Sequence, residues 1–204
     1  MASAARRIAS TELSASEARW ISLKKLTYID QEGKERVWEY AERKTRKSSV
    51  VDAVAIFAIL RSKTNAFPPS TVIVEQYRPP IDRVVIELPA GLVDEHETPE
   101  DAAKRELTEE TGYVGTKIIE TSPIIVCDPG MTNANMKLIT IEVLMEHELT
   151  TPDQHLDTGE HIVRRVVDLE YLESVLKEYD NKGYVVDARL FHLAAGYAMA
   201  TRLK

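Results

Sequence analysis

Three glutamates near the middle of the chain have the spacing of a metal-binding helix face. Glu106 and Glu110 are four residues apart, and Glu109 is three residues from Glu106. At about 100° per residue the three carboxylates fall within an arc of ~100°. Like charges at this spacing repel each other by roughly 0.2–0.5 kcal/mol per pair. A hard divalent cation would remove the conflict, because it takes several carboxylate oxygens as ligands. The alternative is a solvated acidic face.

The helix that would carry these carboxylates has start and stop signals. Thr98 can serve as the N-cap, with a proline at the first helical position and acids in the first turn. Nothing breaks the helix before Gly112, a residue suited to a helix end. Glu109 and Glu110 then lie in the last turn, where the helix dipole disfavours anions. This placement weakens the solvated-face alternative. Gly91 is expected to end the strand before the helix.

The fixed residues of this stretch follow a specific order. Gly91 is followed by five residues, Glu97, seven residues and then Arg105-Glu106-Leu107-x-Glu109-Glu110-x-Gly112. This order resembles the Nudix box at every fixed position except the last, where the family usually has an aliphatic residue and this chain has Tyr113. The resemblance implies a hydrolase that uses magnesium to split a nucleoside diphosphate linked to another moiety.

The same resemblance assigns roles to residues of the box. It implies that Glu106, Glu109 and Glu110 hold the metal, with the Ala90 carbonyl as a further ligand. It also implies that Glu97 and Arg105 brace the loop and the helix, and so belong with Glu109 to the catalytic set.

The composition restricts the possible partners. The 204 residues suggest one domain with a small extra lobe, and 44% hydrophobic content suffices for an ordinary core. A net charge of −7 argues against a nucleic-acid-binding surface, which should be basic. Cys127 is the only cysteine, so no internal disulfide can form and a reducing compartment is favoured. No apolar run reaches the length of a membrane span. The expected partner is a small molecule.

The first residues carry a weak targeting signal. MASAARRIAS contains two arginines and several small residues, as a mitochondrial presequence does, but Glu12 and Glu17 follow closely. We therefore predict a disordered tail over residues 1–18 and a cytoplasmic location. The nucleus is a further expected compartment, and a mitochondrial location stays open.

The apolar patterns predict a mixed sheet with helices at the box and at the C-terminus. A hairpin lobe is expected over 19–48, with a return strand at 36–40 and a basic linker at 41–49. A Nudix domain is expected over 49–204, with strands at 50–60, 71–78, 84–89, 118–126, 136–145 and 162–167, and helices at 169–178 and 187–203. The fold class is therefore α/β (α+β), a Nudix-type mixed sheet sandwiched between helices, with an N-terminal β-hairpin lobe.

Residues outside the box resemble the ADP-ribose and ADP-sugar pyrophosphatases, of the eukaryotic type. Pro129 lies sixteen positions after Tyr113, a spacing shared with that branch. Further matching stretches are Lys25-Leu26-Thr27-Tyr28 with Trp38-Glu39, Gln76-Tyr77-Arg78-Pro79-Pro80, Leu88-Pro89-Ala90-Gly91-Leu92, Asp128-Pro129-Gly130 and Val186-Asp187-Ala188-Arg189. The resemblance implies magnesium-dependent hydrolysis of ADP-ribose and related ADP-sugars to AMP and ribose 5-phosphate, with Mn²⁺ as a substitute ion.

Two tryptophans before the box are candidates for holding adenine. Aromatic faces hold a flat π-system by stacking, and Trp20 and Trp38 can supply them. The alternative is that both are core or hairpin-pairing residues. In relatives the hairpin is exchanged between subunits, which implies a homodimer whose pockets are completed by the partner. By the same resemblance Glu39 binds the adenine amino group, Arg43 and Arg78 contact phosphate and ribose oxygens, and Met131 lines the pocket.

The attacking water needs a base outside the metal set, because glutamates bound to metal are poor bases. Glu160, at the end of the irregular segment 147–159, matches the loop glutamate of close relatives. Asp153 and Asp157 are rivals in the same segment, and a solvated loop acid is the plain alternative. Segments of this kind in compact domains are often functional.

Two other functions remain open. One is hydrolysis of another nucleoside diphosphate derivative, such as a dinucleotide or an oxidised guanine nucleotide, because tryptophan stacks on any purine. The other is a module that binds ADP-ribose without cleaving it. The intact carboxylates Glu97, Glu106, Glu109 and Glu110 argue against the second function.

Overall fold

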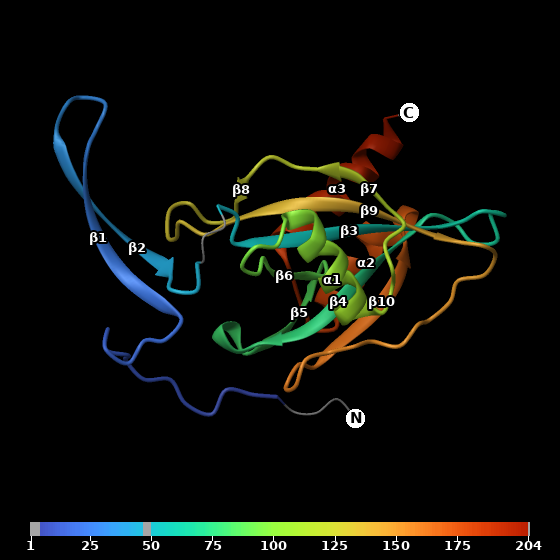
Figure 1. Cartoon of the computed structure of the whole chain (residues 1–204), viewed down its shortest axis with the longest axis horizontal. Helices are drawn as coiled ribbons and strands as arrows, with labels where there is room; N and C mark the ends of the chain where they lie inside the picture. The colour runs from blue at the N-terminus through green and yellow to red at the C-terminus, as the bar shows by residue number, and fades with distance from the viewer. Residues whose placement is uncertain (1–4, 47–49, 204) are drawn as a thin grey trace.

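A computed structural model describes residues 5–46 and 50–203 as a hairpin that projects from an α/β body (Figure 1). The hairpin consists of β1 (Ile21–Ile29) and β2 (Glu35–Arg43), paired antiparallel. In its turn the Asp30 carboxylate accepts hydrogen bonds from two backbone amides, those of Glu32 and Lys34, each at 2.9 Å. The turn residues are therefore fixed by a local side-chain bond.

The second hairpin strand is longer than predicted. It continues through Arg43 into the stretch predicted to be a linker, of which residues 47–49 lie outside the described part of the chain. The ladder continues because Ala41, Glu42 and Arg43 still pair with β1, at Leu23, Ser22 and Ile21. Beyond it the Lys44 amide donates to the Trp20 carbonyl (2.9 Å), and the Ala41 amide donates to the Met131 carbonyl (2.8 Å) of a loop of the body. This loop ties the base of the hairpin to the body.

The described part of the body is built on a nine-stranded mixed sheet with the order β11-β5-β4-β3-β9-β7, in which β10 pairs with β4, β6 with β3 and β8 with β9. Its centre is β3 (Ala53–Ser62), which pairs in parallel with β9 (Asn135–Met145). The other strands are β4 (Ser70–Arg78), β5 (Arg83–Glu87), β6 (Ala90–Leu92), β7 (Lys117–Thr121), β8 (Ile125–Val126), β10 (Ile162–Asp168) and β11 (Val185–Val186).

Helices cover both faces of this sheet. The apolar residues of β3 alternate, so Val54 and Ile56 join one core with Leu107 of α1 (Pro99–Thr111), while Phe57 packs against the other. The second core contains Leu176 of α2 (Leu172–Asn181) and Leu190 of α3 (Ala188–Arg202). The predicted sheet between helices is confirmed. Within the described residues, no helix is long and apolar enough to cross a membrane.

The ends of α1 follow the sequence signals. The Thr98 hydroxyl accepts a hydrogen bond from the Asp101 amide (3.1 Å), and Pro99 is the first helical residue. At the other end Gly112 has φ +76°, a left-handed conformation suited to glycine, and its amide donates to the Thr108 carbonyl. A predicted helix at 169–178 instead begins with a 3₁₀ turn at Leu169–Tyr171.

Two strand predictions were wrong in detail. Gly91 does not end a strand, because it lies within β6 and pairs with Val54 of β3. The strand predicted at 118–126 is divided into β7 and β8. Between them Pro123 has no amide to donate, and the Ser122 hydroxyl instead accepts the Leu138 amide (2.9 Å).

The predicted tail at 1–18 falls partly outside the described residues. From residue 5 to residue 20 the described chain forms neither helix nor strand, and the Arg7 amide donates to the Asp82 carboxylate at 2.8 Å.

Candidate active site

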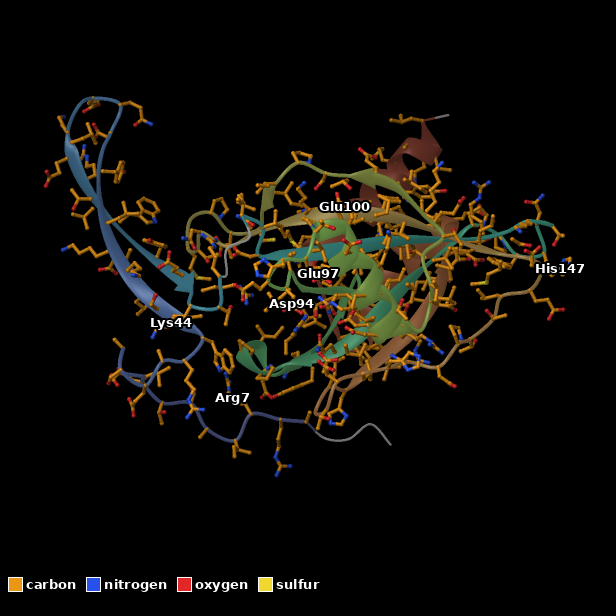
Figure 2. All side chains as sticks on the ribbon, in the orientation of Figure 1. Arg7, Lys44, Asp94, Glu97, Glu100 and His147 are labelled. Atoms are coloured by element: carbon orange, nitrogen blue, oxygen red, sulfur yellow. The ribbon has the colours of Figure 1, made fainter. Side chains whose placement is uncertain are left out.

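Arg105 organises the carboxylates around α1. Its guanidinium binds Glu97 through two bonds of 3.0 Å, Glu106 through one of 2.8 Å and Glu109 through one of 3.0 Å. It also donates to the Leu92 carbonyl (3.1 Å), which fixes the helix to the end of β6. Figure 2 shows Glu97 close to Asp94 in the loop before α1, and the Asp94 amide donates to the Glu97 carboxylate (3.0 Å). The Arg105 guanidinium thus connects the loop before α1, the strand β6 and the helix α1.

Glu110 is a buried carboxylate aimed at β6. Its Oε2 atom accepts the Ala90 amide at 3.1 Å, and the side chain is otherwise enclosed. Burial, with the negative charges of Glu106 and Glu160, raises the pKa of Glu110 to about 8. Burial also raises the pKa of Glu106, because it outweighs the opposing effect of Arg105. Burial therefore disfavours the ionised form of both carboxyls as long as no cation is bound beside them.

These carboxyls fit a hard divalent cation, which would stabilise their ionised form. The available ligand atoms are carboxylate oxygens and a backbone carbonyl oxygen of β6, and such ions prefer oxygen ligands of this kind. Glu106, Glu109 and Glu110 would hold the ion, with the Ala90 carbonyl beside them. Among the described residues no three acidic, His or Cys side chains form a ready-made cage. In this structure the carboxylates of Glu106 and Glu109 are ion-paired with the Arg105 guanidinium.

Gly91 is needed for space at this site. A Cβ atom at Gly91 would overlap the carboxylate group of Glu106. The glycine therefore allows the backbone of β6 to lie directly against a carboxylate of the helix. Its place inside the strand follows from this close approach.

A cavity of about 420 Å³ opens beside β6. Arginines from three elements line it: Arg43 from β2, Arg78 from β4 and Arg189 from α3. The buried Glu87 connects two of them, with its carboxylate 2.7 Å from Arg78 Nε and 3.6 Å from Arg189 Nη2. The remaining lining residues are Ala53, Ala90, Gly91, Leu92 and Met136. A cavity with this lining suits a ligand with several negative charges.

Sequence reasoning predicted Arg43 and Arg78 but missed Glu87 and Arg189. Asp187 caps α3 by accepting the amides of Arg189 and Leu190, and it also binds the Arg189 guanidinium at 2.7 Å. A signal for this arginine was present in the matching stretch Val186-Asp187-Ala188-Arg189. The contact was missed because Arg189 is far along the chain from the other residues that line the cavity.

Neither tryptophan belongs to the core, but the hairpin-pairing part of that alternative fits Trp38, which pairs with Leu26. Trp20 is 70% exposed and Trp38 is 48% exposed. The Trp38 indole donates to the Gly130 carbonyl (2.9 Å) and borders a hollow of about 490 Å³. The hollow is also lined by Leu26, Tyr40, Val126, Pro129, Thr132 and Asn133.

The structure does not bring the two tryptophans of one chain together. Trp38 pairs with Leu26 on β1, six residues beyond Trp20. At about 3.3 Å per residue, this places them roughly 20 Å apart along the hairpin. Glu39 is exposed and follows Trp38 directly, so its side chain points to the opposite face of the hairpin. Met131 is exposed in the loop that accepts the Ala41 amide.

Glu160 lies in an exposed turn of the loop before β10. After burial and nearer charges, its negative charge adds to the raised pKa of Glu106 and of Glu110, and the loop that carries it is bonded to the C-terminal end of α1 through the His155 amide and the Glu109 carbonyl (2.8 Å). Of its two rivals, Asp153 is placed with its carbonyl against Gly112, where a Cβ would overlap it. Asp157 forms the same turn as Glu160, and its amide donates to the Glu160 carboxylate (3.2 Å).

Comparisons with known proteins agree with this geometry. Residues 50–195 match the NUDIX domain model. An uncharacterised Nudix hydrolase of Schizosaccharomyces pombe is 46% identical over 181 residues, covering 88% of this chain and 86% of that protein. The ADP-ribose pyrophosphatase of Saccharomyces cerevisiae is 44% identical over 186 residues, covering 91% and 80%.

A solved structure supports the fold. The crystal structure of an ADP compounds hydrolase has a TM-score of 0.59 to this chain at 16% identity, covering 91% of this chain and 86% of that one. The domain match spans most of the chain and both relatives are similar over most of their length, so the chain belongs to the Nudix family.

Proposed function

We propose that this protein hydrolyses ADP-ribose and related ADP-sugars, with Mg²⁺ as the cation and Mn²⁺ as a substitute. ADP-ribose and water would give AMP and ribose 5-phosphate. The observation that carries the proposal is the arginine-lined cavity that opens directly onto Ala90 and Gly91 of β6. A pyrophosphate in that cavity lies beside the carboxylates of α1. The name of the Saccharomyces cerevisiae relative, ADP-ribose pyrophosphatase, supports the choice of nucleotide.

The cavity arginines bind and orient the pyrophosphate. A guanidinium offers a planar fork of donors that matches phosphate oxygens. Glu87 holds Arg78 and Arg189 at the cavity before substrate arrives, so less side-chain freedom is lost on binding. Arg43 adds a third positive charge from the base of the hairpin.

In the reaction the oxygen of a water forms a new bond to one phosphorus, and a bridging P–O bond breaks. When bound, the cation polarises a phosphoryl oxygen and lowers the pKa of the attacking water. Glu106, Glu109 and Glu110 would hold the ion, while Arg105 and Glu97 keep the loop and the helix in register. Glu160 accepts the proton of the water; its match to the loop glutamate of close relatives and the effect of its charge on Glu106 and Glu110 support this role.

Product analysis tests this proposal. Wild type, Glu110→Gln and the surface control Glu178→Gln are each incubated with ADP-ribose and Mg²⁺, and AMP is measured. We expect AMP from wild type and from the control, and a loss of about 100-fold or more in Glu110→Gln, because metal-site residues contribute at least that much.

Other outcomes would overturn parts of the proposal. Cleavage of a dinucleotide or an oxidised guanine nucleotide in place of ADP-ribose would refute the substrate. Binding of ADP-ribose without cleavage would refute the hydrolase and favour the binding module.

We further propose that the active form is a homodimer in which hairpins are exchanged. The hairpin exposes Leu23, Ile29 and Val37, and a two-stranded hairpin on its own is marginally stable in water. One chain separates its two tryptophans by roughly 20 Å, so an adenine sandwiched between both needs Trp20 and Trp38 from different copies.

Complementation tests the exchange. Trp20→Ala and Trp38→Ala should each bind ADP-ribose weakly, since every pocket of either homodimer lacks one face. After the two are unfolded together and refolded, half of the dimers are mixed, and each mixed dimer has one intact pocket. About one quarter of wild-type activity should return, because stacking faces contribute independently of the chain that supplies them. No recovery, or a monomer by light scattering, would refute the exchange.

A further inference from the structure

The loop before β10 is attached to the C-terminal end of α1. The last carbonyls of a helix have no partner within it. Here the Glu109 carbonyl accepts the His155 amide (2.8 Å), and the Glu110 carbonyl accepts Gln154 Nε2 (2.5 Å). The Thr111 carbonyl accepts the guanidinium of Arg164 from β10. The turn that carries the metal-site glutamates is therefore capped by residues on either side of Glu160.

Gln154 also closes the loop on itself. The same Nε2 atom donates to the Ile162 carbonyl at 3.1 Å, and a side-chain amide has two hydrogens with which to make both bonds. Gln154 precedes the segment 155–161 and Ile162 follows it. One half-buried side chain thus joins the two ends of this segment to each other and to α1.

The tip of the segment is a turn held by its own bonds. The Glu160 amide donates to the Asp157 carbonyl (3.0 Å), and the Asp157 amide donates to the Glu160 carboxylate (3.2 Å). Gly159 has φ +93°, which permits the turn. Because the tip is closed locally, the position of Glu160 relative to α1 depends on how the base of the segment is fixed.

We propose that Gln154 is a positioning residue for hydrolysis, which closes the base of the 155–161 segment and so holds the Glu160 carboxylate at the box carboxylates. The inference rests on the proposed function, in which Glu160 takes the proton of the attacking water. A base has to lie within hydrogen-bond reach of that proton. Without the Gln154 bonds the base of the segment is held only by the His155 amide at one end and by β10 at the other, so the tip turn and Glu160 gain freedom to shift.

The test removes the two bonds and retains the side-chain volume. Gln154→Met is compared with Tyr113→Phe, which removes a different loop contact, the 2.9 Å bond from the Tyr113 hydroxyl to the Thr150 carbonyl. This contact lies outside the 154–162 closure. With ADP-ribose and Mg²⁺ we expect kcat of Gln154→Met to fall by about 10–100-fold, because displacing a reacting group by ~1 Å costs this much. KM should stay within about 3-fold, and Tyr113→Phe should change kcat less than about 3-fold.

A double mutant separates positioning from general damage. If Gln154 acts through Glu160, then Gln154→Met should slow wild type but should not slow Glu160→Gln further. Equal losses in both backgrounds would overturn the inference, as would an unchanged kcat in Gln154→Met.

Two further controls keep the result interpretable. Gln154→Ala is a second variant, for the case that Gln154→Met does not fold. The smaller side chain lets water reach the Glu110 and Ile162 carbonyls, which preserves the fold. Wild-type activity on ADP-ribose is measured first. Its absence refutes the proposed function together with this inference, whereas an active wild type and an equally active Gln154→Met refute the inference alone.

Discussion

The buried carboxyl of Glu110 predicts a specific pH dependence of stability. In the unfolded chain this group titrates near its ordinary value of 4.5, while in the metal-free fold its pKa is about 8. Between these values the unfolded chain has released the proton and the folded chain has kept it. The unfolded state then binds fewer protons, so the free energy of unfolding falls as pH rises through this window.

The magnitude follows from the pKa shift. Each pH unit inside the window is worth about 1.36 kcal/mol, and the folded carboxyl begins to ionise near the upper end. Between pH 6 and pH 8 Glu110 should therefore remove about 2 kcal/mol from the free energy of unfolding. The glutamine of Glu110→Gln cannot titrate. The free energy of unfolding of wild type minus that of the variant should therefore fall by this amount from pH 6 to pH 8, because the other titratable groups contribute nearly equally in both proteins.

The assay is urea unfolding in a chelator at pH 6 and pH 8, followed by far-ultraviolet circular dichroism. Tryptophan fluorescence is unsuitable, because both tryptophans lie exposed at the hairpin and report poorly on the body. Mg²⁺ at pH 8 should stabilise wild type more than the variant. A difference between the proteins that is constant from pH 6 to pH 8 would refute the reasoning about Glu110.

Three further predictions concern packing around the site. Gly91→Ala should reduce hydrolysis by about 100-fold, because its Cβ overlaps the Glu106 carboxylate and displaces it; Gly196→Ala in α3, where the Cβ meets open space, should instead raise the free energy of unfolding by about 0.5–1 kcal/mol and leave AMP release unchanged. Arg46→Met should destabilise the fold by about 3 kcal/mol in urea unfolding, because it leaves the buried Asp52 carboxylate without bonds of 2.7 and 2.6 Å, and a loss below about 1 kcal/mol would contradict this account. Leu107→Ala, at a fully buried position of α1, should cost about 2–5 kcal/mol and lower the thermal midpoint; an unchanged midpoint would show that this core does not support the helix.

Local signals predicted helix α1 well. The bounds of α1 depend on a hydroxyl cap, a proline and a glycine, each of which acts within a few residues. Apolar runs likewise predicted β4 and β10 closely. These features are readable because their energetics are decided along a short stretch of chain.

The residues missed are those whose role depends on distant partners. Gln154 is an ordinary loop residue until the fold places the Glu110 and Ile162 carbonyls on either side of it. Glu87 was treated only as part of a strand, although it connects arginines from β4 and α3. Gly91 was interpreted as a strand end because the sequence does not show that Glu106 packs on it. Each error concerns a long-range contact.

The parallel pairing of β3 with β9 has a consequence for how the protein is made. The register joins Ala53 to Met136, so 83 residues separate the paired positions. At synthesis rates of about 5–20 residues per second, β3 is complete several seconds before its central partner exists. During that interval a ten-residue strand with a largely buried, apolar face has an open edge, and α1 has only part of its packing surface. We expect nascent chains that end before β9 to associate with chaperones, and mutations that slow β3–β9 docking to lower cellular yield without changing the rate constant of the folded enzyme.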